Sequence, residues 1–395
     1  MVRRYRLALF LIAFSARLIL PALGFNPIAS DTATYLSMGR GIVDGVGMVD
    51  EAGVLTAFRS PTYPVFLAGM LKLTGGSLTG IQIIQALIAS LVPLVVFEIL
   101  LPHVGIVRAF LGGIILALDP ISIPPSAYIL TETIGAALLL LWVAAWSRSM
   151  RFGRGCAFFM TGLIGGGLVY QTMITLILHP ISVGLRYLTK PRSWKLCLLS
   201  LFIFLIPMGL WTVRNRAVFG EGTAVRAGGF GFLLWASMNY DFPWLLSPYD
   251  DRGDYIFRQE KTVAKHYPPN EIHALYMRKG LARILAEPLA CAMRAVKGTF
   301  WSWVEVPGAM KSLDRMPAVK WGLRGANLVI LLLALAGLPG ALRTPEGRIA
   351  AAVIAYFVLF HAPLYPIPRY FIPVRPELAL LAAFAFRGHS PTFQH

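Results

Sequence analysis

The chain has 395 residues, of which 56% are hydrophobic and only 14% are charged, and its mean hydropathy is +0.65. Soluble domains carry about 25% charged residues, so this composition excludes a soluble protein and indicates an integral membrane protein. The net charge of +17 does not indicate nucleic-acid binding, because most basic residues lie in short connections between apolar runs, as membrane topology requires.

The first apolar run follows Arg3, Arg4 and Arg6 and extends to Leu23. A secretory signal peptide has a similar basic and apolar pattern. Such a peptide ends in a small-x-small cleavage pattern, and Asn26-Pro27 stands in that place here. We therefore expect this run to be retained as the first membrane span.

A helix needs about 20 apolar residues to cross the hydrocarbon core of a bilayer. By this measure we predict an all-α polytopic membrane protein with about ten transmembrane helices, forming a single integral membrane domain over residues 1–395. The predicted spans are 7–23, 79–101, 105–121, 127–146, 155–170, 172–188, 194–213, 323–342, 349–365 and 371–386. The pair of spans around Gln171 could also be one broken helix or a helical hairpin.

The short basic connections predict the orientation of these spans. They lie at 3–6, 148–154, 190–195 and 343–348, and the positive-inside rule places them in the cytoplasm. Two long segments then lie outside: the first outer loop, 24–78, and the long outer loop, 214–322, which we expect to form interfacial helices in part. The sequence thus predicts a multi-pass protein of the plasma (inner) membrane whose functional residues face the periplasm or the exterior.

The first outer loop has the pattern of a site rather than of a connector. Asp31 comes shortly after the first span and opens a predicted polar-apolar helix that runs to Arg40. After a glycine-rich segment comes Arg59-Ser60-Pro61-Thr62-Tyr63-Pro64, in which the prolines restrict the backbone. Segment 62–74 is apolar but too short to cross the bilayer, so we expect an interfacial helix.

Three acids lie at similar depth near the outer ends of predicted spans: Asp31 after the first span, Asp119 at the end of the third, and Glu132 one turn inside the fourth. Charges at this depth are expensive and mark functional sites. Each acid also has a structural interpretation: Asp31 could cap its helix, Asp119 could end a helix before Pro120, and Glu132 could bond within the bundle. We favour catalysis for Asp31, leave both interpretations open for Asp119, and regard the structural role as the more frequent one for Glu132.

Four arginines lie in outer loops beside membrane ends: Arg59, Arg214, Arg216 and Arg369. The planar guanidinium group suits phosphate, although a single interfacial arginine as often binds lipid headgroups. Because all four arginines lie on the same predicted side of the membrane, we favour phosphate binding for them as a set. His266 and His273 lie seven residues apart and lack metal-ligand spacing, and the three cysteines show no paired pattern.

Taken together, these motifs resemble the membrane glycosyltransferases that use polyprenyl-phosphate sugars. That family includes the protein O-mannosyltransferases and the lipid A aminoarabinose transferases, which share the C-type glycosyltransferase fold. The matching motifs are Asp31…Tyr35, Gly39 to Gly45, Arg59-x-Pro61-x-Tyr63-Pro64, Thr131-Glu132, Arg214-Asn215 and Arg369-Tyr370. The chain departs from larger relatives in lacking a sizeable C-terminal soluble domain and in having Thr32 where many have a second acid.

The resemblance implies transfer of a sugar from a polyprenyl-phosphate carrier to a glycan, lipid or protein acceptor of the cell envelope. With the position of the residues in the chain, it predicts these site residues: Asp31, Asp119 and Glu132 as catalytic residues, with Asp119 assisting Asp31 or orienting the acceptor; Arg59, Arg214 and Arg369 on the donor phosphate; and Tyr35, Tyr63 and Tyr370 in the substrate groove. The family allows a divalent metal, but no residue pattern here requires one. A transporter, a lipid-linked-glycan flippase and an inactive scaffold stay open as alternatives, although transporters usually place charges near the midplane and show an internal repeat.

Overall fold

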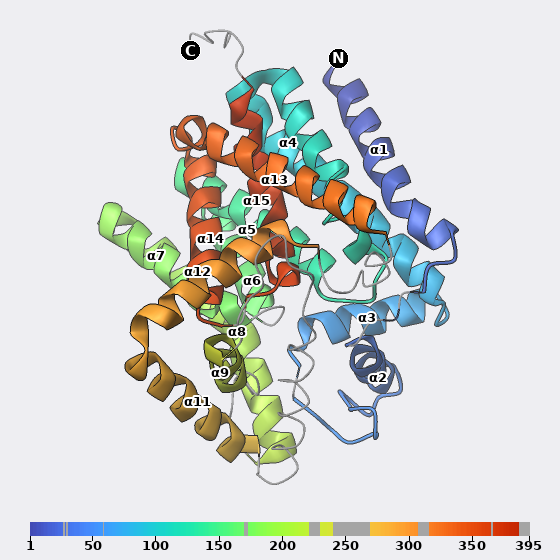
Figure 1. Cartoon of the computed structure of the whole chain (residues 1–395), viewed down its shortest axis with the longest axis vertical. Helices are drawn as coiled ribbons and strands as arrows, with labels where there is room; N and C mark the ends of the chain where they lie inside the picture. Colours follow the sequence, from blue (N-terminus) through green and yellow to red (C-terminus); the bar gives the residue numbers. More distant parts are fainter. Residues whose placement is uncertain are drawn as a thin grey trace. The chain divides into compact units, whose positions relative to one another are not determined.

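The computed structural model describes residues 1–26, 28, 31–57, 59–169, 173–220, 230–239, 269–306, 316–364 and 366–386. These residues form helices and connections, and their only strand-like feature is an isolated antiparallel bridge between Val49 and Leu55 (Figure 1). The prediction of an all-α protein is confirmed for this part of the chain.

The chain divides into two compact units. The first, which we call the membrane unit, comprises Met1–Val225, Ala326–Ile354 and Ile372–His395, and the second, the outer-loop unit, comprises Arg226–Gly325 and Ala355–Phe371. The second unit includes most of the long outer loop predicted from the sequence. A single integral domain over the whole chain stays a prediction.

The membrane unit contains most of the long helices. Its helices are α1 (Val2–Ala22), α2 (Thr32–Val43), α3 (Thr62–Leu73), α4 (Leu78–Ala117), η1 (Pro124–Ser126), α5 (Glu132–Phe152), α6 (Gly155–Val169), η2 (Met173–Leu176), α7 (Leu178–Thr189), η3 (Pro191–Ser193), α8 (Trp194–Phe219), α15 (Arg375–Ala382) and η6 (Ala383–Ala385). The outer-loop unit contains α9 (Phe230–Asn239), α11 (Pro269–Ala286) and α12 (Pro288–Val304). Residues of α13 (Pro317–Ala341), α14 (Pro345–His361) and η5 (Pro368–Val374) belong to both units.

Five helical segments among the described residues are long and apolar enough to cross a membrane: α1, α4, α5, the segment Pro191–Phe219 and α13. These long apolar helices are consistent with the predicted multi-pass membrane protein. Helix α6 is apolar but has only 15 residues, and α7, α14 and α15 have 12, 17 and 8. The count of ten spans stays a prediction, because only five segments meet the length and hydropathy expected for a span among the described residues. The C-type fold also stays a prediction.

Helix α4 consists of two arms. A straight helix of its 40 residues would be about 60 Å long, twice the thickness of the hydrocarbon core. Gly105 interrupts it with a φ of +77°, a backbone conformation that glycine adopts without steric cost. A Cβ at Gly113, in the second arm, would lie 3.3 Å from the carbonyl oxygen of Pro93 in the first, so the arms pack against each other. The break falls at the predicted boundary between spans 79–101 and 105–121.

Helices α6 and α8 pack closely through two glycines of α6. A Cβ at Gly162 would lie 2.3 Å from the carbonyl oxygen of Ser200, and one at Gly166 would lie 2.9 Å from that of Phe204. Only glycine permits such approach of two backbones, which is the basis of small-residue packing between membrane helices. The glycine pair is thus a packing motif.

We expect Gly162→Ala to destabilise the protein by about 1–3 kcal/mol, because the added methyl group meets backbone rather than a movable side chain. Gly167→Ala is the matched control, since a Cβ there has no other atom within 4 Å and alanine favours the helix. Unfolding of the detergent-solubilised variants would measure the difference. Equal stability of the two variants would contradict the packing role.

Candidate functional site

The first outer loop contributes two helices to a shared hydrophobic core. Tyr35 of α2 and Tyr63 of α3 are buried together with Ile81 of α4 and Ile129 of the connection before α5. Helix α2 corresponds to the helix predicted from Asp31 to Arg40, and α3 corresponds to segment 62–74. Because their apolar faces are buried against α4, both helices are held in place rather than left as a free loop.

Buried hydrogen bonds fix this loop on the segment that precedes α5. The Tyr63 hydroxyl donates to the side-chain oxygen of Gln85 at 2.9 Å, and the amide of Gln85 donates to the Tyr128 carbonyl at 2.7 Å. The Thr32 hydroxyl donates to the Ile129 carbonyl at 3.2 Å. Buried polar groups with partners of this kind specify one arrangement of the chain, so the site residues nearby have a rigid support.

Asp31 and Arg59 form an ion pair beside this core. An Arg59 Nη2–H donates to Asp31 Oδ1 at 2.8 Å, and the two side chains are 30% and 21% exposed respectively. Asp31 occupies the N-cap position of α2, but its side chain makes no capping hydrogen bond. The Arg59 guanidinium lies 5.5 Å from the ring centre of Tyr35. Helix capping thus does not explain Asp31, and both members of the pair stay accessible to a ligand.

Glu132 lies near the same aromatic pair. It is the first residue of α5 and is only 6% exposed. The rings of Tyr35 and Tyr63 meet edge to face with their centres 5.0 Å apart. Burial, and then the charge of Glu132 and the nearby Tyr35, raise the pKa of Tyr63 well above its ordinary value. Tyr63 therefore stays a neutral hydrogen-bond donor, and Glu132 belongs to the surroundings of the Asp31 pair.

Arg214 contacts the same loop from α8. Its Nη1–H donates to the Thr56 carbonyl at 3.3 Å, three residues before Arg59, and to the Asn215 side-chain oxygen at 3.0 Å. The guanidinium also lies 4.8 Å from the ring centre of Trp211. The structure thus groups Asp31, Arg59, Glu132, Tyr35 and Tyr63, and it places Arg214 against the same loop at Thr56. Arg216, two residues on, is exposed.

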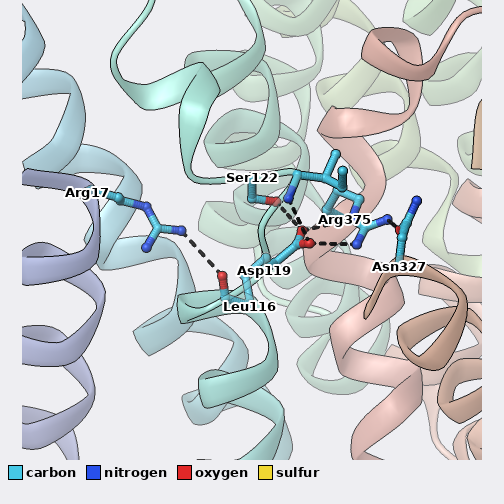
Figure 2. A network of polar contacts seen from close by, with 7 residues as sticks. Arg17, Leu116, Asp119, Ser122, Asn327 and Arg375 are labelled. Carbon is cyan, nitrogen blue, oxygen red and sulfur yellow. Dashed lines mark hydrogen bonds and ion pairs between the residues drawn. The ribbon is translucent and has the colours of Figure 1, made fainter. Parts of the chain in front are cut away.

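Asp119 is the centre of a different polar network (Figure 2). Both of its carboxylate oxygens accept from Arg375, at 2.8 and 2.7 Å, and Ser122 donates a further hydrogen bond at 2.5 Å. Arg375 also donates to Asn327, and the two charged side chains are 3% and 2% exposed. A carboxylate engaged in this way has little capacity left for a substrate, so the geometry favours the structural interpretation that the sequence left open.

Sequence reasoning missed several buried charged residues of the membrane unit, among them Arg17, Arg375 and Glu377. Arg17 of α1 is 2% exposed and donates to the carbonyls of Ala13 and Ala117, both at 3.0 Å. It also donates to the carbonyl of Leu116 at 3.3 Å, as Figure 2 shows. Arg375 and Glu377 of α15 are 3% and 0% exposed. A single charged residue inside an apolar run is the signal that could have found them, because such residues face the interior of a bundle.

Arg369 and Tyr370 belong to the outer-loop unit. The Tyr370 ring stacks on His361 with ring centres 5.2 Å apart, and His361 in turn contacts the carbonyl of Phe357 at 2.8 Å. Their placement on the donor phosphate and in the substrate groove stays a prediction. His266 lies outside the described part of the chain.

Among the described residues, no group of three or more histidines, cysteines, aspartates or glutamates could hold a metal ion. The described site is built from two carboxylates, guanidinium groups and tyrosines. No protein-family model matches the chain, and no curated protein matches it either. The resemblance to polyprenyl-phosphate glycosyltransferases is thus a hypothesis from the motifs.

Proposed function

We propose that the protein is a membrane glycosyltransferase that moves a sugar from a polyprenyl-phosphate carrier to an acceptor at the outer face of the plasma membrane. The observation that supports this proposal is the accessible pair of Asp31 and Arg59, whose side chains contact at 2.8 Å beside Tyr35 of α2. The carboxylate of Asp31 can accept a proton, and the guanidinium of Arg59 can bind a phosphate. A transferase with a phosphate leaving group needs these two functions side by side.

In the proposed reaction, a hydroxyl or amine of the acceptor attacks the anomeric carbon of the donor sugar. The new bond forms as the bond from that carbon to the phosphate oxygen breaks, and polyprenyl phosphate leaves with the electron pair. Asp31 accepts the proton that the acceptor loses, and Arg59 stabilises the charge on the leaving phosphate. Because a bound phosphate competes for the guanidinium of Arg59, donor binding frees an oxygen of Asp31 for this step.

The surrounding residues have supporting roles in this proposal. Arg214 adds a second guanidinium at the edge of the first outer loop, through its bond to Thr56. Tyr63, held by Gln85, and Tyr35, beneath Arg59, fix the position of the guanidinium. A lipid-linked donor fits the location, because soluble nucleotide sugars are not present outside the plasma membrane.

The test is a transfer assay with the purified protein in liposomes. A panel of polyprenyl-phosphate hexoses and pentoses with isotope-labelled sugars serves as donor, and fractionated envelope lipids, glycans and proteins serve as acceptors. We expect label to move from one donor to one acceptor fraction with stoichiometric release of polyprenyl phosphate. Failure to release polyprenyl phosphate from any donor would contradict the proposal, and movement of the intact donor between the leaflets would support a flippase instead.

A further inference from the structure

Helices α7 and α8 are joined by the short turn η3, and an open groove of about 630 Å³ lies between them. Val183, Gly184 and Tyr187 line it from α7, and Trp194, Leu198 and Leu201 line it from α8. On each helix these residues recur at three- and four-residue spacing, so each helix turns one face to the groove. The volume falls within the range of about 300–1,000 Å³ that ligand sites occupy.

The walls of the groove are apolar and open. Tyr187, Trp194 and Leu198 are 49%, 48% and 54% exposed. Gly184 contributes no side chain, and a Cβ built there has no other atom within 4 Å. Tyrosine and tryptophan are enriched where membrane proteins meet the headgroup region of the bilayer. A hydrocarbon chain is thus the occupant that fits these walls.

Helices α7 and α8 form a helical hairpin, and the turn at its tip, around η3, is basic. Lys190, Arg192 and Lys195 are exposed there, beside Pro191 and Trp194 of the groove. The whole stretch 178–219 contains no aspartate or glutamate, so no side chain within it offsets this charge. Clusters of lysine and arginine at a membrane surface attract anionic lipid headgroups. The groove and its tip therefore match the two parts of an anionic phospholipid.

We propose that the groove between α7 and α8 binds one anionic phospholipid, with an acyl chain along Val183, Gly184 and Leu198 and the phosphate at Lys190, Arg192 and Lys195. The positive-inside pattern of the sequence predicts that this lipid belongs to the cytoplasmic leaflet. The proposal does not rest on the proposed transferase activity, because the groove is formed by residues that take no part in it.

Native mass spectrometry of the detergent-solubilised full chain, after incubation with equal amounts of phosphatidylglycerol and phosphatidylcholine, tests the proposal. We expect the wild-type protein to retain one phosphatidylglycerol. Gly184→Leu fills the groove and should lower its retention at least tenfold. Gly209→Leu is the matched control, because Gly209 lies on α8 outside the groove and also has no atom within 4 Å of a built Cβ.

A triple variant, Lys190→Gln with Arg192→Gln and Lys195→Gln, should bind both lipids equally, since it keeps the walls and loses the charged tip. The proposal would be overturned if Gly184→Leu and Gly209→Leu retained phosphatidylglycerol equally. It would also be overturned if the wild type bound phosphatidylglycerol and phosphatidylcholine equally. If Gly184→Leu fails to fold, brominated lipid provides a second measurement. The emission of Trp194 is taken as the difference between the wild type and Trp194→Phe. Its quenching by brominated phosphatidylglycerol should saturate at one lipid per protein. Equal quenching by brominated phosphatidylcholine would refute the site.

Discussion

Asp31→Asn is expected to lower kcat/KM for sugar transfer by about 10²- to 10⁴-fold, the contribution that a general base makes to catalysis. Asparagine keeps the size of the side chain and can still contact Arg59, but it cannot accept the proton of the acceptor. The transfer assay with the purified protein, run with saturating acceptor over a range of donor concentrations, measures the loss.

The fold should survive this substitution. The ion pair of Asp31 with Arg59 is partly exposed, and pairs of this kind contribute only about 0–1 kcal/mol to stability. The buried bonds of Thr32 and Tyr63, which hold the first outer loop, do not involve Asp31. Asp44→Asn is the matched control, because Asp44 is an exposed acid at the other end of α2.

Kinetics separate a base from a residue that only positions Arg59. If Asp31 accepts the proton, Asp31→Asn lowers kcat, and Asp31→Glu restores part of it. If Asp31 serves Arg59 alone, Arg59→Lys already removes what Asp31 contributes, and adding Asp31→Asn to Arg59→Lys lowers kcat no further. A variant Asp31→Asn with the wild-type kcat would therefore remove Asp31 from the chemistry.

The arrangement around Asp31 could be predicted because its signals are local. A polar-apolar repeat specified α2, and the proline-bearing corner specified the start of α3. The two elements lie in one loop on one side of a predicted membrane, so few arrangements could keep Asp31 far from Arg59. Sequence reasoning thus anticipated that Asp31 and Arg59 lie close together, and their roles in a reaction stay a prediction.

The partner of Asp119 could not be predicted in this way. Arg375 lies 256 positions further along the chain, and its sequence surroundings, Arg375-Pro376-Glu377, read equally well as the start of a short helix. Pairing between distant elements depends on how the helices pack, and periodicity within one helix carries no information about it. The same applies to Arg17, whose partners are backbone carbonyls of α4 and its own helix.

The buried pair of Asp119 and Arg375 gives the second large prediction. Asp119→Asn leaves the guanidinium of Arg375 buried without its counter-charge, and we expect a loss of about 3–5 kcal/mol in the free energy of unfolding. Arg375→Met leaves the carboxylate in the same position and should cost a similar amount. Titration of the protein in mixed micelles with a denaturing detergent would measure both losses.

The double variant Asp119→Leu with Arg375→Met decides what Asp119 does. Removing both charges together removes the desolvation cost as well, so we expect the double variant to recover most of the stability that either single change loses. The recovery is incomplete, because Ser122 and Asn327 lose hydrogen bonds worth about 1 kcal/mol each. We expect the double variant to retain sugar transfer, since the geometry assigns Asp119 to Arg375 rather than to a substrate. A double variant as stable as expected but inactive would instead place Asp119 in the reaction beside Asp31.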